Sequence, residues 1–212
     1  MEVTLAALSK TFGREAVIRE ASFSLSSGSR TAILGPNGSG KSTLLQLIAG
    51  ALVPSSGSIT HAVSGTPIAA DMVYRQVSIA APYLGLYEDL SLRECIVFHA
   101  RFKPFRPGIG EADVARIAYL DLALEKPVRN FSSGMKQRLK LALAILSNTP
   151  LLLLDEPASN LDAEAISWFR ALLRDHTDGR TLVVASNRQP AEHDLCDRAL
   201  ELRNGVPVLV QP

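Results

Sequence analysis

The chain has 212 residues, of which 47% are hydrophobic, and its 22 basic and 21 acidic side chains leave a formal net charge of +1. A chain of this length can bury a substantial core in one large α/β domain, or in one domain with an inserted subdomain. A charge balance this close to neutral provides no global field for nucleic acid or for an anionic membrane, so neither is expected as a direct partner.

Neither a targeting signal nor a membrane-spanning segment is expected. Residues 1–5 include an acid and lack the long apolar core of a signal peptide. Every apolar run is shorter than the ~20 residues that are needed to cross a bilayer. The two cysteines, Cys95 and Cys196, lie far apart and favour free thiols in a reducing compartment. We therefore expect a protein that is soluble on its own and reaches a membrane only through a partner.

The chain begins with two predicted strands. Alternating apolar and polar residues predict strands over residues 3–5 and 21–25, with a turn over residues 12–15 between them. Phe12 lies beside this turn, where a core role is not obvious. Its ring could stack on a base, or it could belong to the core at the end of a strand, and composition leaves both open.

A P-loop pattern follows, Gly-Pro-Asn-Gly-Ser-Gly-Lys-Ser, between an apolar run at 31–34 and a helix-forming stretch at 43–49. Glycines let backbone N–H groups close around phosphate oxygens, and the positive end of the next helix faces the same anion. We expect Lys41 to reach the β- and γ-phosphates and Ser42 to complete a Mg²⁺ shell. A glycine-rich turn that only joins a strand to a helix is the alternative. The residues expected to bind the triphosphate are Gly35, Pro36, Asn37, Gly38, Ser39, Gly40, Lys41, Ser42 and Thr43.

The middle of the chain is predicted to change from strands to helices. A short strand at 58–60 and a strand at 77–80 flank a stretch of weak pattern, 61–73, which we expect at the surface. Helices are predicted at 91–101 and 111–120. The histidines have no partners at ligand spacing, so no metal-binding histidine is assigned.

A second candidate phosphate site begins near residue 131. Phe131-Ser132-Ser133-Gly134-Met135 precedes apolar residues that recur with helical spacing, and either Ser132 or Ser133 would cap the helix. A helix start that carries Ser and Gly can bind phosphate. An ordinary helix cap is the alternative, and it is favoured when this stretch is considered alone.

Paired acids follow four consecutive leucines at 151–154. A buried parallel strand delivers its carboxylates to the edge of the sheet where α/β proteins bind ligands. We expect Asp155 to hold Mg²⁺ and Glu156 to orient or deprotonate the attacking water. An acidic loop after a core strand is the alternative. The chain then continues with a helix at 163–176 capped by Asp162, a buried strand at 181–185, and a hairpin that turns at Asn204-Gly205.

In this order and at this spacing, these motifs resemble an ABC-transporter ATP-binding subunit over essentially the whole chain. The resemblance implies that residues 131–137 are the signature, that residues 159–162, which include Asp162, are the D-loop, and that Phe12 stacks on adenine. The Ser-Ser-Gly-Met signature is nearer the variant found with exporter-type permeases than the commoner Leu-Ser-Gly-Gly-Gln.

The resemblance also implies a fold and a domain organisation. The fold would be the α/β P-loop NTPase fold of ABC ATPases, with an N-terminal antiparallel β-subdomain and an inserted α-helical subdomain. Residues 1–212 would be a single ATP-binding domain. Its core ATPase subdomain would comprise residues 1–82 and 148–212, and its helical signature subdomain residues 83–147.

The implied function is ATP binding and hydrolysis, with Mg²⁺, to energise an integral-membrane transporter that is an exporter. Two chains would form a head-to-tail dimer on the cytoplasmic face of the cell membrane, bound to a permease. Each ATP would lie between the P-loop of one chain and Ser132, Ser133, Gly134 and Met135 of the other. Two alternatives are a weakly hydrolysing cassette that acts as a nucleotide switch and a soluble ABC-type ATPase without a transport role.

Two positions depart from the family pattern. Pro82 stands where a glutamine usually contacts Mg²⁺, and proline offers neither a side-chain ligand nor an N–H group. Asn187 stands where a histidine usually contacts the γ-phosphate. An amide can donate a hydrogen bond but cannot carry a proton, so Asn187 is expected to support hydrolysis less well.

Overall fold

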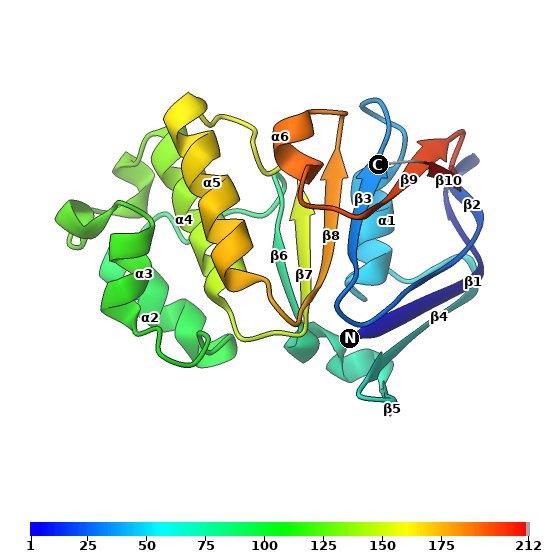
Figure 1. Cartoon of the computed structure of the whole chain (residues 1–212), viewed down its shortest axis with the longest axis horizontal. Helices are drawn as coiled ribbons and strands as arrows, with labels where there is room; N and C mark the ends of the chain where they lie inside the picture. Colours follow the sequence, from blue (N-terminus) through cyan, green and yellow to red (C-terminus); the bar gives the residue numbers. More distant parts are fainter. Residues whose placement is uncertain (211–212) are drawn as a thin grey trace.

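Two sheets organise the chain in the computed structural model, which describes residues 1–210 (Figure 1). One is antiparallel, with the strand order β2-β1-β4-β5, and the other has the order β10-β9-β3-β8-β7-β6. In the second sheet β10 pairs antiparallel with β9, and the remaining neighbours pair in parallel. The strands are β1 (Glu2–Phe12), β2 (Glu15–Leu25), β3 (Arg30–Leu34), β4 (Ser56–Val63), β5 (Thr66–Ile68), β6 (Val77–Ala80), β7 (Leu151–Asp155), β8 (Thr181–Ser186), β9 (Arg198–Arg203) and β10 (Val206–Val210).

The helices lie on both sides of the six-stranded sheet. Figure 1 shows α2 to α5 on one side and α1 on the other, between this sheet and the antiparallel strands. The α-helices are α1 (Lys41–Ile48), α2 (Leu92–Phe102), α3 (Glu111–Ile117), α4 (Ser133–Leu146), α5 (Ala163–His176) and α6 (Pro190–His193), and the 3₁₀ helices are η1 (Ala70–Gln76), η2 (Asp121–Ala123) and η3 (Val128–Asn130).

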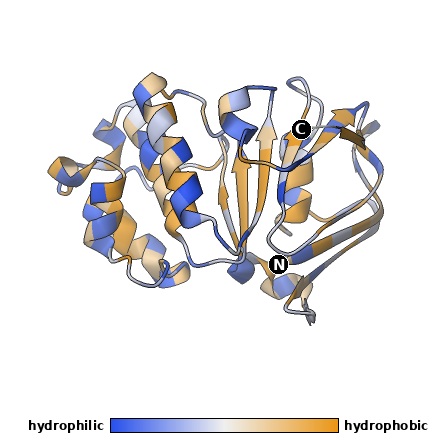
Figure 2. Ribbon diagram, viewed as in Figure 1, coloured by the Kyte–Doolittle hydropathy of each residue, from blue (hydrophilic) through white to orange (hydrophobic). Residues whose placement is uncertain are grey.

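The central strands are buried on both faces, as the sequence predicts. Along β8, Leu182 and Val184 pack in the core that includes α4 and α5, whereas Val183 and Ala185 pack in the core that includes α1 and the antiparallel sheet. This division follows from the alternation of side chains along a strand. The hydropathy colours of β6, β7 and β8 show the same apolar centre (Figure 2). The sheet therefore separates two cores and provides a rigid base for the loops at its edge.

Several predicted elements have different bounds or were missed. The stretch of weak pattern, 61–73, contains β5 and most of η1, and Val73 is buried, so the expectation of a purely surface segment is wrong. The helix predicted at 111–120 ends at Ile117, because Ala118 is its C-cap and Tyr119 adopts a left-handed φ of 57°. The predicted hairpin is confirmed, with Asn204 and Gly205 both at positive φ.

The parallel strands bring three loops to one edge of the sheet. The P-loop follows β3, Asp155 ends β7 and Glu156 follows it, and Asn187 follows β8. Because β3, β8 and β7 are neighbours that run in the same direction, these loops leave the sheet side by side.

Candidate nucleotide site

The P-loop has a backbone that suits an anion. Gly38 and Gly40 have φ values of 79° and 101°, in the left-handed region that favours glycine. A Cβ atom on Gly40 would lie 2.9 Å from Cγ1 of Val17, so the close approach of the strand also requires glycine. Helix α1 starts at once, with no side-chain cap and no acid in its first turn. Its first N–H groups thus face no competing carboxylate of their own helix.

Lys41 is buried at the centre of this loop, with 4% of its surface exposed. Its Nζ donates to the carbonyl oxygens of Gly35 and Pro36, at 2.9 and 3.1 Å. Nζ also lies 3.8 Å from Oε1 of Glu156. The predicted cation and the predicted catalytic carboxylate therefore meet at one point, although they lie 115 positions apart (156 minus 41) in the sequence.

Glu156 is held in an unusual backbone conformation. Its φ is 45°, and its N–H donates to the carbonyl oxygen of Ala185 at 2.9 Å. A non-glycine residue in this region stores strain, and such strain is concentrated at functional sites.

Asp155 ends β7 with 2% of its surface exposed, and neither of its carboxylate oxygens has a hydrogen-bond partner. Burial raises the pKa of this carboxyl, and the neighbouring Ser42 hydroxyl opposes part of that change. Two buried carboxylate oxygens without donors fit a hard cation, which takes oxygen ligands. Within residues 1–210 no group of three or more His, Cys, Asp or Glu side chains could hold a metal. A cation here would need phosphate or water oxygens in addition to Asp155 and Ser42.

Phe12 shares a cavity with the P-loop. The cavity has a volume of about 390 Å³, and 49% of the Phe12 surface is exposed. Its side chain lines this cavity together with P-loop residues, and Nζ of Lys10 lies 5.0 Å from the ring centroid. An exposed ring at this place is available for stacking. The cavity is lined by Phe12, Val17, Asn37, Gly38, Gly40, Lys41, Ser42, Thr43 and Glu156.

The predicted signature residues lie elsewhere on the chain. Ser132 is the N-cap of α4, and its Oγ accepts from the N–H of Met135 at 3.2 Å. Ser133 is the first residue of that helix. A second cavity, of about 530 Å³, is lined by residues that include Ser132, Gly134, Met135, Asn160 and Asp162. None of its lining residues belongs to the P-loop cavity, so one chain does not bring the two motifs together.

The two departures from the family pattern are at the surface. Asn187 is exposed directly after β8, and Pro82 is exposed two residues after β6. Gln76 is the last residue of η1 and precedes β6, so it lies at the other end of that strand from Pro82. Gln76 therefore cannot replace the missing glutamine.

Two contacts near Glu156 were not anticipated from the sequence. Nε2 of Gln137 donates to the Pro157 carbonyl at 2.9 Å, and Oε1 of Glu192 accepts from the Ala158 N–H at 3.0 Å. Glu192 lies on the four-residue helix α6, where no periodic pattern marks a buried acid.

Comparison with known proteins identifies the family of this chain. The family model described as ABC transporter matches residues 18–159. A Nod factor export ATP-binding protein I from Rhizobium etli is 32% identical over 205 residues, which cover 93% of this chain. The chain spans 64% of the length of that relative.

Two solved structures share the fold. An ATP-binding subunit of an ABC transporter superimposes with a TM-score of 0.84 at 26% identity. The aligned region includes all of this chain and 90% of the solved one. A bacterial Atm1-family ABC exporter with ATP bound gives a TM-score of 0.81 at 25% identity, over 98% of this chain and 38% of its own. The chain therefore belongs to the ABC transporter family.

Proposed function

We propose that this chain binds Mg–ATP, hydrolyses it, and thereby drives an integral-membrane exporter. The observation that carries the proposal is the meeting of Lys41, Asp155 and Glu156 at the carboxyl edge of the parallel sheet. A phosphate-binding loop alone would support the binding of ATP. A carboxylate beside that loop also supports the attack of water on the γ-phosphate.

The residues of the site have separate roles in this proposal. The N–H groups of the P-loop and the start of α1 bind phosphate oxygens, and Lys41 exchanges its carbonyl acceptors for the β- and γ-phosphates. Glu156 orients the attacking water and accepts its proton. Phe12 stacks on the adenine ring. Mg²⁺, held by Asp155 and Ser42, would neutralise the charge of the phosphates.

The separation of the two cavities supports a dimer. Because Ser132, Ser133, Gly134 and Met135 lie away from their own P-loop, we infer that they complete the site of a second copy in a head-to-tail arrangement. The α4 start supplies N–H groups to the same triphosphate from the other side. Asp162, at the start of α5, belongs to this shared surface.

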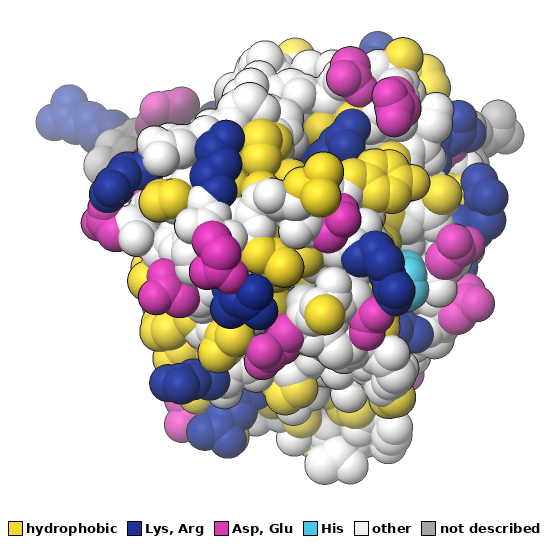
Figure 3. All heavy atoms as spheres, turned by 90° about the vertical axis from the view of Figure 1, so that its left-hand side faces the viewer, with side chains coloured by type: hydrophobic (Ala, Val, Ile, Leu, Met, Phe, Trp, Pro, Cys, Tyr) yellow, Lys and Arg dark blue, Asp and Glu magenta, His cyan; other side chains and the backbone are white. Residues whose placement is uncertain are grey.

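The membrane partner is inferred from the surface of the helical part. No helix among residues 1–210 is long and apolar enough to cross a membrane. An apolar cavity of about 320 Å³ is lined by residues that include Leu86, Tyr87, Phe98 and Phe102. Figure 3 shows hydrophobic side chains gathered among charges on the face formed by the helical end. Such a surface suits a protein partner, and we propose a permease that holds the chain at the inner face of the membrane.

A cassette that closes on ATP but hydrolyses it slowly is a second candidate. Pro82 and Asn187 favour it, because Pro82 offers no side-chain ligand for Mg²⁺ and the Asn187 amide cannot carry a proton. Glu156 and its contact with Lys41 favour hydrolysis.

Phosphate release by the full chain, purified with its membrane partner, distinguishes these functions. We expect release by the wild-type chain to exceed that of Glu156→Gln, which keeps the shape of the side chain but cannot accept a proton. Equal rates in the two proteins, with ATP still bound by both, would support the nucleotide switch instead. A chain that binds no ATP would contradict both functions.

A further inference from the structure

The peptide unit between Pro157 and Ala158 is hydrogen bonded on both of its edges. Its carbonyl oxygen accepts from Nε2 of Gln137 at 2.9 Å, and its N–H donates to Oε1 of Glu192 at 3.0 Å. Because the atoms of a peptide bond lie in one rigid plane, two bonds on opposite edges fix the orientation of that plane. The plane begins one residue after Glu156.

The burial of the Glu192 carboxyl costs desolvation free energy. Its exposed fraction is 2%, and Oε2 has no hydrogen-bond partner. Burial raises the pKa of its carboxyl, which favours the neutral form. Buried polar atoms without partners are rare and cost stability. Natural chains retain such costs mainly at functional sites.

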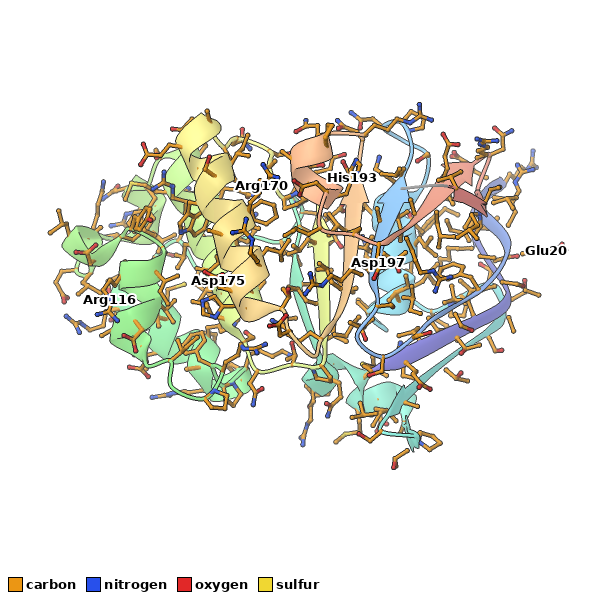
Figure 4. The ribbon with its side chains drawn as sticks, in the orientation of Figure 1. Glu20, Arg116, Arg170, Asp175, His193 and Asp197 are labelled. Atoms are coloured by element: carbon orange, nitrogen blue, oxygen red, sulfur yellow. The ribbon has the colours of Figure 1, made fainter. Side chains whose placement is uncertain are left out.

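The two side chains that hold the peptide come from different parts of the fold. Gln137 belongs to α4, the helix that begins at the signature, and Glu192 belongs to α6, which follows β8 and Asn187. Just beyond α6, Asp194 forms a partly exposed ion pair with Arg170 of α5. Figure 4 shows Arg170 on α5 and His193 on α6. We call the hydrogen bonds that Gln137 and Glu192 make to this peptide the clamp. The clamp joins the signature helix, the loop after β7 and the segment after β8.

Glu156 directly precedes this peptide in the chain. Its backbone is strained at a φ of 45°, and its N–H is fixed to Ala185 on the neighbouring strand. The Glu156 carbonyl oxygen accepts from the N–H of Ser159 at 3.1 Å, and the Pro157 carbonyl oxygen is the next group along the chain, held by a side chain. We propose that Gln137 and Glu192 are positioning residues that hold the Glu156 carboxylate in the geometry that water activation requires. This inference rests on the proposed hydrolysis of ATP.

The chain offers matched variants for a test. Glu192→Gln retains a carbonyl oxygen that can accept from Ala158, whereas Glu192→Leu removes the acceptor. Gln137→Leu removes the donor on the other edge of the same peptide. Asp194→Asn weakens the pairing of the α6 segment with α5 without touching the clamp, and it is the control.

We expect Glu192→Leu and Gln137→Leu each to lower kcat on the order of tenfold to a hundredfold, because small misplacements of a catalytic group have effects of this size. The KM for Mg–ATP should stay within about twofold, since neither residue touches the nucleotide. Glu192→Gln and Asp194→Asn should retain most of the wild-type kcat. Normal turnover in Gln137→Leu, or an equal loss in Glu192→Gln and Glu192→Leu, would overturn the inference. If Glu192→Leu does not fold, Gln137→Leu decides the test.

A second readout does not depend on catalysis. Hydrogen exchange of the Ala158 amide, followed by NMR, should accelerate in Glu192→Leu relative to Glu192→Gln, while amides of β7 remain protected. Unchanged exchange at Ala158 would overturn the clamp. A wild-type chain that hydrolyses no ATP would instead contradict the proposed function, and the exchange measurement then decides the clamp by itself.

Discussion

Asn187 is the residue at which the site departs most clearly from its family pattern. It is exposed directly after β8, so a larger ring can be placed there without disturbing the core. An imidazole near neutrality can carry a proton and donates a stronger hydrogen bond when it is charged.

We expect Asn187→His to raise kcat severalfold while the KM for Mg–ATP changes little, because the gain is realised in the transition state. Steady-state phosphate release measures both constants. Asn187→Ala is the control, and it should not exceed the wild type. A histidine variant that is no faster than the wild type would show that this position does not limit hydrolysis.

Among single residues, motif spacing indicates a site residue only where chemistry demands a fixed residue type. The P-loop, Asp155 and Glu156 are predicted because a phosphate cradle and a cation site allow few alternatives, and the fold brings Lys41 and Glu156 together. Glu192 and the role of Gln137 were missed, because each acts on one backbone group that only the folded chain brings near. No spacing rule relates position 192 to position 158.

Among the elements, α2 contacts the end of α4 through a half-buried histidine. His99 Nε2 lies 2.9 Å from Oγ of Ser147, and its ring stacks on Phe105 with centroids 5.7 Å apart. Burial, followed by the neighbouring Lys103, lowers the pKa of His99 to about 4. His99 lies within the helix predicted at 91–101, and its ring packs between α2 and the end of α4.

Stability should therefore fall as the pH falls from about 6.5 to about 4. In this window the unfolded chain binds a proton at His99 and the folded chain does not, so protonation favours unfolding by at most about 3 kcal/mol. Denaturant unfolding at pH 7 and pH 4.5 measures the change. His99→Gln, which cannot titrate, should lose less stability on acidification than the wild type. An equal loss in the two proteins would assign the effect to other groups, such as His61, whose pKa is also lowered by burial.

The sequence predicted secondary structure best in strands that are buried on both faces of the sheet and in turns with a characteristic residue pair. Four consecutive leucines gave β7, and the Asn204-Gly205 pair gave the β9–β10 turn, because local chemistry decides both. The sequence did not indicate β5, which has three residues and takes its register from β4. A strand this short has no period of its own, so tertiary pairing decides it.

At the scale of the whole molecule, the separate cavities predict a functional dimer in which each site takes half from either chain. A chain that carries Lys41→Ala lacks a working P-loop, and a chain that carries Ser133→Arg lacks a working signature. Each protein alone should be nearly inactive. In a mixed head-to-tail dimer, one site combines the intact P-loop of one chain with the intact signature of the other.

Equal mixing of the two inactive variants should therefore restore activity. If the chains exchange freely, about half of the dimers are mixed and each has one good site of two, which predicts about a quarter of the wild-type rate if sites act independently. Phosphate release before and after mixing measures the recovery. A mixture that stays as inactive as its components would contradict the shared site.

Isothermal titration of the intact chain with Mg–ATP measures whether the P-loop binds a triphosphate through Lys41. We expect saturable binding by the wild type and at least about tenfold weaker binding by Lys41→Ala, because hydrogen bonds to a charged group contribute roughly 1.5–3 kcal/mol. Arg93→Ala, which removes an exposed ion pair with Glu125, should bind like the wild type. No binding by the wild type, or equal binding by Lys41→Ala, would contradict the account.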